Sequence, residues 1–434
     1  MVLSAFLLPG GYDARAWRLE GSRAEELGQL QIAMDIAKAY EAAKLDSVFI
    51  ADTISAVPLL NGDVKFASPY EPMTTLAALA SVTTNIGLIG TFSTTWNHPF
   101  NLARQLQSLD VLSNGRAAWN VVTSSRAEEN FGAELLSKED RYRRAAEVVE
   151  AVTQLWAAWS DDAVITDRET GRWIDPELIR PVNFHGEFVS TEGFMNIRRS
   201  PQGAPVIVQA GQSSGGLDLG ASVAEAVYTA QPDRQHSIDY YAAYKENIAK
   251  KGRNPEHTKL LPGLVPYIGD TEAEAREFRN SLQDFVDFDL HRKEFAEMYT
   301  IKLDDLELDD HIPHERFAGK NDDNAGTRFT AFRDLAIEQG YSLRELLIHR
   351  ASSGGHLALV GTASQIADTM IDWFDNRACD GFSLNAPAIP VSVQQITEKL
   401  VPELQERGYF RTEYEGTTLR ENLGLPIPAA WDKQ

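Results

Sequence analysis

The sequence predicts a (β/α)8 barrel, an α/β fold in which eight parallel strands alternate with helices. Eight short apolar or β-branched runs are present, and longer stretches with helical spacing separate them. The runs do not alternate strictly between apolar and polar residues, which is typical of strands covered by helices. A doubly wound sheet with a second domain is the alternative, but no linker rich in Pro, Gly or Ser separates two domains.

The predicted strands have between four and eight residues each, and they come in a regular order with the helical stretches. They are Val2–Leu7, Ser47–Ala51, Ile86–Thr91, Ala117–Val122, Pro205–Gln209, Ala226–Ala230, Leu261–Ile268 and Gly381–Leu384. Runs of this length and composition are typical of short buried strands.

The predicted helices follow from apolar residues that recur three and four positions apart. Ser22 and Glu25 have the spacing of a capping box, so we expect the first helix to begin there, with an apolar face made of Leu30, Ala33, Met34, Ala37 and Tyr40. The other predicted helices include Met73–Thr83, Phe100–Leu112, Lys138–Trp159, Leu217–Val223, Ile238–Lys250 and a last one near Val393–Gly408.

Two stretches interrupt the alternation. One covers about residues 160–200, where Val182–Gly186 and Glu187–Ile197 predict a β-hairpin. The other covers residues 271–347, which are helical but irregular. We therefore predict one barrel domain over residues 1–434 with these two insertions. We hypothesise that the second insertion is a lid, because it is the longest departure from the pattern and contains Gly319 and Gly326.

Composition and charge narrow the classes of partner. Lys plus Arg (41) against Asp plus Glu (63) gives a net charge of −22, and so acidic a surface repels nucleic-acid phosphates and anionic lipid headgroups. The single cysteine, Cys379, excludes an intrachain disulfide framework. No secretory signal or membrane span is apparent. We expect a cytoplasmic protein with neither nucleic acid nor membrane as a partner.

Polar residues stand at the ends of consecutive predicted strands. Asp52 follows the second strand, Thr91 and Ser93 are at the end of the third, and Asn120 and Thr123 are at the end of the fourth. The carboxyl ends of the strands meet at one end of a barrel, where catalytic groups are found, so these side chains are expected to converge. Each also has a simpler interpretation, since Asp52 could begin a turn and Asn120 could cap the next segment.

The segment Gly211–Gly216 connects the fifth strand to a helix and is rich in small residues. Backbone N–H groups at the start of that helix would favour an anion, and Ser213 and Ser214 add hydroxyl donors, so the segment predicts a phosphate site. The same residues also fit G-x-S-x-G, the nucleophile turn of serine hydrolases. Ser213 as a nucleophile, with His349 or His356 as the base, therefore stays open as an alternative.

The remaining histidines give no metal site. His311 and His314 are the nearest approach to zinc spacing, but Pro313 breaks the helix that would align them. Trp96 and His98 lie just past a strand end and could line a pocket, although His98 could equally be a capping or surface histidine. Aromatic residues on several loops could form an apolar cleft; these are Tyr12, Trp17, Phe92, Trp96, Trp119 and Phe131.

A series of short motifs extends over nearly the whole chain in a specific order. They are Ala16–Arg18, Leu45–Asp52, Glu71-Pro72, Leu76–Leu79, Phe100–Arg116, Trp119–Ser124, Asp140–Tyr142, Gln209–Ser213, Val360–Thr362 and Asp380–Phe382. In these motifs the chain resembles the bacterial-luciferase-like flavin monooxygenases, in particular the branch with nitrilotriacetate, long-chain alkane and dibenzothiophene-sulfone monooxygenases.

The resemblance implies a (β/α)8 barrel that takes reduced FMN (FMNH2) from a separate NAD(P)H-dependent flavin reductase and uses O2 to oxygenate a small organic substrate. It also implies a homo-oligomer. By their places in the motifs, Asp52, Thr91 and Asn120 would contact the isoalloxazine ring. A serine hydrolase and a flavin-binding protein without catalysis are the competing hypotheses, and the substrate cannot be read from the sequence.

The resemblance also assigns the phosphate end of the flavin to Tyr142, Ser213 and Ser214. Lys138 stands where members of the family often have a histidine, and as a cation it could meet the phosphate. The chain departs from the family near Tyr12 and again at Trp96 and His98. We therefore expect these three residues to belong to a substrate pocket that is particular to this enzyme.

Overall fold

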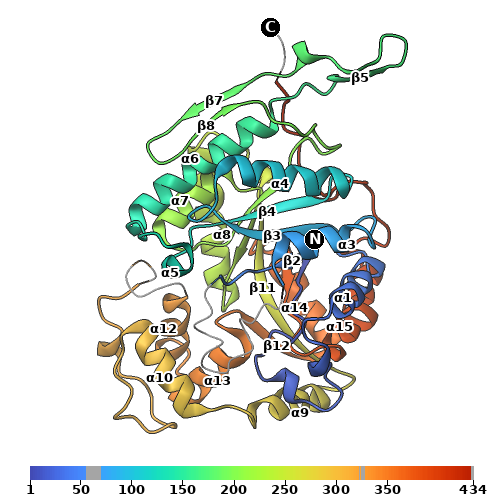
Figure 1. Ribbon diagram of the computed structural model, residues 1–434. Helices are drawn as coiled ribbons and strands as arrows, with labels where there is room; N and C mark the ends of the chain where they lie inside the picture. Colours follow the sequence, from blue (N-terminus) through green and yellow to red (C-terminus); the bar gives the residue numbers. More distant parts are fainter. Residues whose placement is uncertain (55–69, 322, 324–327, 432–434) are drawn as a thin grey trace.

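A closed barrel of eight parallel strands forms the centre of the molecule in the computed structural model, which describes residues 1–54, 70–321, 323 and 328–431 (Figure 1). The strands are β1 (Val2–Phe6), β2 (Ser47–Ile50), β3 (Gly87–Ser93), β4 (Ala117–Val122), β9 (Val206–Gln209), β10 (Ala226–Thr229), β11 (Lys259–Gly269) and β13 (Gly381–Leu384). Their order is β10-β9-β4-β3-β2-β1-β13-β11, and pairing of β10 with β11 closes the ring. The predicted (β/α)8 barrel is confirmed.

Helices cover the outside of the barrel. They are α1 (Leu30–Ala42), α3 (Pro72–Ala80), α4 (Pro99–Leu112), α6 (Lys138–Trp156), α7 (Ser214–Val223), α8 (Arg234–Lys250), α14 (Ala363–Asp375), α15 (Val391–Gln395) and α16 (Val401–Glu406). The strands are buried on both sides, since the outer side packs against these helices and the inner side fills the barrel, which explains why they lack an alternating pattern.

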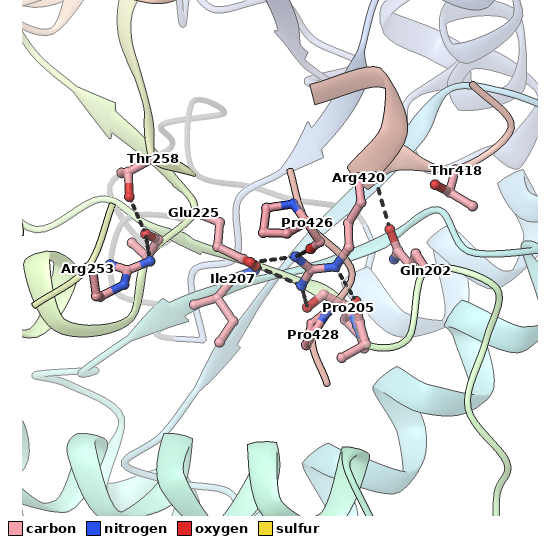
Figure 2. Close-up of polar contacts among 12 residues, drawn as sticks. Gln202, Pro205, Ile207, Glu225, Arg253, Thr258, Thr418, Arg420, Pro426 and Pro428 are labelled. Atoms are coloured by element: carbon pink, nitrogen blue, oxygen red, sulfur yellow. Dashed lines mark hydrogen bonds and ion pairs between the residues drawn. The ribbon is translucent and has the colours of Figure 1, made fainter. Parts of the chain in front are cut away.

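The C-terminal segment seals the amino ends of the strands. Helix α17 (Leu419–Leu423) adds Leu419 and Leu423 to the apolar cluster inside the barrel. Arg420 on the same helix is buried, and its guanidinium binds both carboxylate oxygens of Glu225, at 2.5 and 2.8 Å, as well as the carbonyls of Ala204 and Pro205 (Figure 2). The site must therefore lie at the carboxyl ends of the strands.

Two hairpins follow α5 (Glu128–Phe131) and α6. Strands β7 (Val182–His185) and β8 (Ser190–Gly193) form the hairpin that the sequence predicts. Strands β5 (Val164–Asp167) and β6 (Arg172–Ile174) form a second one, which the sequence analysis missed. In Figure 1 these hairpins lie at the top of the view, and the helices that follow β11 lie at the bottom.

The stretch after β11 contains α9 (Glu272–Gln283), α10 (Phe288–Tyr299), α12 (Phe329–Ile337) and α13 (Leu343–Ser353). Phe295, Phe329 and Leu347 belong to an apolar cluster of their own, so α10, α12 and α13 support one another, whereas Leu282 of α9 packs with Val265 and Tyr267 of β11. Strand β12 (Leu357–Thr362) then pairs with the second half of β11 outside the ring, and it too was not predicted. The division of the chain into one domain with two insertions stays a prediction.

The first helix begins later than predicted. Ser22 does not cap it, because the Ser22 hydroxyl donates to the carbonyl of Trp17 at 2.6 Å and a 3-10 turn (Ala24–Glu26) follows. Helix α1 begins at Leu30. On the predicted apolar face Ala33, Ala37 and Tyr40 are buried and Met34 is half-buried, but Leu30 at the first position is 41% exposed. Hydrogen bonding within the preceding turn therefore replaces the expected capping box.

Candidate functional site

A cavity of about 200 Å³ opens at the carboxyl ends of β2, β3 and β4. Asp52, Thr91 and Ser93 line it, together with Ser124 and Arg126 from the segment after β4. Asp52, Thr91 and Ser93 were expected at this place, whereas Ser124 and Arg126 were missed. Their position directly after a predicted strand was a signal that could have identified them.

Thr91 and Asn120 are register partners on neighbouring strands, and the Asn120 amide donates to the Thr91 hydroxyl at 3.0 Å. Both side chains are buried. The Asn120 side-chain oxygen has no hydrogen-bond partner among the described residues, although it is buried. A buried acceptor without a donor is costly, so this oxygen is suited to a donor on a bound ligand.

Asp52 lies at the rim of the same cavity. Burial and then the negative charge of Glu71 raise the pKa of the Asp52 carboxyl to about 6, although the Thr53 backbone N–H donates to it. A carboxyl group that titrates near neutral pH can accept or donate a hydrogen bond within the working range of an enzyme.

The predicted phosphate segment forms a tight turn at the start of α7. Ser213 is the N-cap, accepts a long hydrogen bond from the Gly216 N–H at 3.4 Å, and shares a hydrogen bond of 2.9 Å with the Tyr142 hydroxyl. A Cβ atom on Gly215 would lie 2.6 Å from the Tyr142 ring, and one on Gly216 would lie 2.9 Å from Gly211. The glycines are required because the chain passes so close to itself and to Tyr142.

An acidic side chain from the stretch after β11 lies on this turn. The Asp323 carboxylate accepts from the Ser214 N–H at 2.9 Å and from the Ser214 hydroxyl at 3.0 Å. Lys138 donates from Nζ to the Asp323 carbonyl at 2.8 Å and lies 3.5 Å from the same carboxylate oxygen. These bonds, first of all the one from the Ser214 N–H, lower the pKa of Asp323. Ser214 and Lys138 thus meet at one anion, as the phosphate assignment requires.

The expected substrate-pocket residues lie in different surroundings. Trp96 stacks on Phe131 with a centroid distance of 4.8 Å, and its indole N–H donates to the Arg126 carbonyl at 3.0 Å, which places it beside the cavity rim. His98 is the N-cap of α4 and accepts from the Phe100 N–H at 3.2 Å. Tyr12 is buried and its ring lies 5.9 Å from that of His356. Their assignment to the pocket stays a prediction.

Three of the aromatic residues proposed for the cleft point elsewhere. Trp119 packs against Trp156 of α6, and its indole N–H donates to the Phe92 carbonyl at 3.0 Å, so it faces the outer helices. Phe92 belongs to the same outer apolar cluster. Trp17 is 42% exposed. The direction of a side chain on a strand is set by register, which the apolar pattern of a buried strand does not reveal.

Among the residues that the structure describes, neither candidate histidine is placed as a catalytic base for Ser213. His356 binds the Tyr228 hydroxyl at 2.8 Å, and His349 packs against Phe332 and Tyr341. Neither histidine is bonded to Ser213, whose hydroxyl contacts Tyr142 and Gly216. A nucleophilic serine needs a base within hydrogen-bond reach. The serine-hydrolase alternative is therefore not supported.

Comparison with known proteins decides the family. The sequence model of one protein family, the luciferase-like monooxygenases, matches residues 14–378 of the chain. The chain belongs to this family. As a luciferase-like monooxygenase, the protein is an oxidoreductase, and the resemblance found in the sequence motifs is confirmed.

Two characterised relatives and one solved structure place this family member more closely. It is 41% identical to N-acetyl-S-(2-succino)cysteine monooxygenase of Bacillus subtilis, over 98% of this chain and 97% of that protein. It is 38% identical to nitrilotriacetate monooxygenase component A of Aminobacter aminovorans, over 96% of this chain and 95% of that protein. The structure of riboflavin lyase RcaE with a modified FMN superposes on this chain with a TM-score of 0.85 and is 27% identical to it, over 99% of this chain and 97% of that protein.

These findings also confirm the expected activity, a flavin-dependent monooxygenase with reduced FMN as its cofactor, and give the hydrolase no support. Among the described helices, none has the length and apolar character that crossing a bilayer demands.

Proposed function

We propose that this luciferase-like monooxygenase binds FMNH2 across the carboxyl ends of β2, β3, β4 and β9 and oxygenates a small organic substrate with O2. The observation that carries the proposal is the pairing of two features at neighbouring strand ends. One is the polar cavity with Asp52, Thr91 and Asn120 beside it, and the other is the turn at Ser213 and Ser214. Their polarity matches a flavin, which has a polar ring edge and an anionic tail.

The residues fit FMN on two observations. An acidic group, the Asp323 carboxylate, already accepts hydrogen bonds from the backbone N–H and hydroxyl of Ser214, with Lys138 beside it, so the donor set suits a phosphate. The buried Asn120 oxygen has no donor in the described part of the chain. When bound, reduced FMN supplies the electrons for the activation of O2.

The protein's own groups would orient the cofactor and keep water away from it. Asp52 and the Asn120 oxygen would accept hydrogen bonds from the ring edge, while Ser213, held by Tyr142, and Ser214 would donate to the phosphate. Lys138 would add a positive charge. A closed site strengthens each of these polar contacts, because water no longer competes for them.

The reduced cofactor would come from a separate NAD(P)H-dependent flavin reductase. The name of one relative, nitrilotriacetate monooxygenase component A, supports a system of more than one component. We further propose that the protein is cytoplasmic, in keeping with its single cysteine. That it is a homo-oligomer is proposed from the family resemblance alone.

The replacement Ser213→Ala tests the phosphate assignment. It removes a hydroxyl that would donate to a charged group, so we expect FMN to bind more weakly by ~1 kcal/mol or more, about fivefold in Kd. Fluorescence titration with FMN measures this. Ser222→Ala, on the same helix but bonded to the Asp218 carbonyl at 2.8 Å, is the matched control. An unchanged FMN affinity in the Ser213 variant would contradict the assignment.

Turnover is tested with chemically reduced FMN, O2 and no reductase. N-acetyl-S-(2-succino)cysteine and nitrilotriacetate, which appear in the names of the two relatives, are the first candidate substrates. Product formation that depends on FMNH2 supports the proposal. Saturable FMN binding without substrate-dependent O2 consumption would instead support the flavin-binding protein without catalysis.

A further inference from the structure

Half of the barrel mouth is not used by the proposed flavin site. Strands β1, β10, β11 and β13 bring together a second polar group, which we call the mouth cluster and define as Tyr12, Tyr228, His356 and Asn385. Tyr12 follows β1, Tyr228 is on β10, Asn385 follows β13, and His356 directly precedes β12. All four side chains are buried, with exposures between 0 and 7%.

Hydrogen bonds fix the mouth cluster in one arrangement. The Asn385 amide donates to the Tyr228 hydroxyl at 3.2 Å, and that hydroxyl shares a second hydrogen bond of 2.8 Å with Nε2 of His356. Nδ1 of His356 lies close to Gly263 of β11, where a Cβ atom would be only 2.5 Å away. The backbone thus leaves room for the imidazole where a side chain would block it.

Aromatic side chains in the barrel interior connect the mouth cluster to the strands of the proposed flavin site. The Tyr228 ring lies 4.9 Å from Phe6 and 5.9 Å from Phe49, and Phe49 is on β2, three residues before Asp52. Strand β1 of the mouth cluster is next to strand β2 of the cavity, so the cluster and the cavity lie side by side at the same end of the barrel. A substrate that must reach a flavin at this mouth has the mouth cluster as its other wall.

Arg328 reaches this region from the stretch after β11. It is partly buried and has a positive φ of 70°, a conformation that costs energy for a residue with a side chain. Its Nη1 donates to the Gly354 carbonyl at 2.8 Å, two residues before His356. Burial lowers the pKa of Arg328, but the nearby tyrosines, first of all Tyr12, raise it above its ordinary value. Arg328 therefore remains a cation beside the mouth cluster.

No acidic partner neutralises this cation within residues 1–54, 70–321, 323 and 328–431. Other arginines after β11 do have one: Arg316 pairs with Asp305, Arg333 with Asp334, Arg344 with Asp309 and Arg350 with Glu294. Arg116 and Arg253 also lack an acidic partner among the described residues and donate to backbone carbonyls instead, but Arg328 differs from them because it lies beside the mouth cluster. Such a guanidinium is suited to an anion from outside, and its planar donors match a carboxylate.

We propose that Arg328 binds a carboxylate of the substrate, so that the enzyme selects carboxylated molecules and holds them between the mouth cluster and the flavin. The inference rests on the proposed function, because it assigns the substrate of that same site. Arg328 is a specificity residue in this scheme and takes no part in the transfer of oxygen. The Tyr12 hydroxyl, which is hydrogen-bonded to Arg328, would help to orient the carboxylate.

Binding to the protein loaded with oxidised FMN tests the inference without turnover. Nitrilotriacetate and N-acetyl-S-(2-succino)cysteine are the charged probes, and the trimethyl ester of nitrilotriacetate is the uncharged probe. We expect saturable binding of at least one charged probe by the wild type, a loss of tenfold or more in Arg328→Gln, and a smaller loss in Arg328→Lys. Arg344→Gln, whose arginine has its own acid, is the control and is expected to bind normally.

Two results would overturn the inference by itself. One is an Arg328→Gln variant that binds FMN normally and binds the charged probe as tightly as the wild type. The other is a wild type that binds FMN but neither charged probe, or binds the ester equally well. A wild type that fails to bind FMN would instead contradict the proposed function. The FMN titration of each variant also shows that it is folded.

Discussion

Removal of the Asp323 carboxylate tests whether it competes with the phosphate of FMN for the same donors. In the present structure this carboxylate accepts from the N–H and hydroxyl of Ser214 at 2.9 and 3.0 Å, with Nζ of Lys138 at 3.5 Å. The two charged side chains are each 45% exposed, so solvent screens the pair. Screened pairs of this kind contribute on the order of 0.2–1 kcal/mol, and the hydrogen bonds from Ser214 are likewise weakened by water.

We take the contacts of Asp323 with Ser214 and Lys138 to stabilise the protein without FMN by about 1 kcal/mol in total. The phosphate of FMN must displace them, which raises the apparent Kd for FMN about fivefold. We therefore expect Asp323→Ala to lower the apparent Kd for FMN by about fivefold. Riboflavin, which has no phosphate, should bind equally to both proteins. Fluorescence titrations with the two flavins measure the difference, and Asp309→Ala, which removes an acid bonded to Arg344, is the matched control.

The reasoning is refuted if Asp323→Ala binds FMN no more tightly than the wild type. A gain that riboflavin shows to the same extent would also refute it, because the effect would then not involve the phosphate. A weaker affinity for FMN would mean that Asp323 assists binding and does not compete with it.

Three further variants test other parts of the structure. The pKa of Asp52 is raised to about 6, so protonation of its carboxylate below that pH removes a hydrogen-bond acceptor. We expect the affinity for FMN in titrations to fall below pH 6, and the Asp52→Asn variant to lose this pH dependence. The same dependence in the variant would exclude Asp52 as its cause. Arg420→Met leaves the largely buried Glu225 carboxylate, 16% exposed, without its partner, so the free energy of unfolding in urea should fall by about 3 kcal/mol, while the FMN affinity of the folded protein stays unchanged. Weaker FMN binding would contradict the placement of this pair away from the site. Gly263→Ala would place a Cβ atom 2.5 Å from His356, so substrate binding should weaken more than FMN binding; equal loss of both in titrations would contradict a separate substrate wall.

Much of the barrel was predictable because its strands are short apolar runs and its helices are periodic over one or two turns. The elements that could not be predicted are those whose formation depends on segments far away in the sequence or that have little apolar pattern. Strand β12 exists because β11 extends beyond the ring and offers a free edge there. The exposed hairpin of β5 and β6 has little apolar pattern, and Trp173 on it is 56% exposed.

The candidate site shows the same division. Asp52 was identifiable because it directly follows a predicted strand, and Ser213 because it lies in a segment of small residues between a strand and a helix; both kinds of position converge at one end of a barrel. The inward direction of Tyr228 and the outward direction of Trp119 were not identifiable, since both are on strands that are buried on each side. Arg328 gave no signal in the sequence, because the lack of an acidic partner in the described part of the chain is a property of the folded protein.

The sequence by itself determined the order of strands and helices, the small-residue turn before α7 and the family. These features depend on residues that are near one another in the chain, where spacing and composition act directly. Only the tertiary structure decided which distant groups meet, such as Asp323 with Ser214, 109 residues away, and with Lys138, 185 residues away. The physical reason is that closure of the barrel and packing of the later helices, which no local pattern encodes, bring these groups within hydrogen-bond distance.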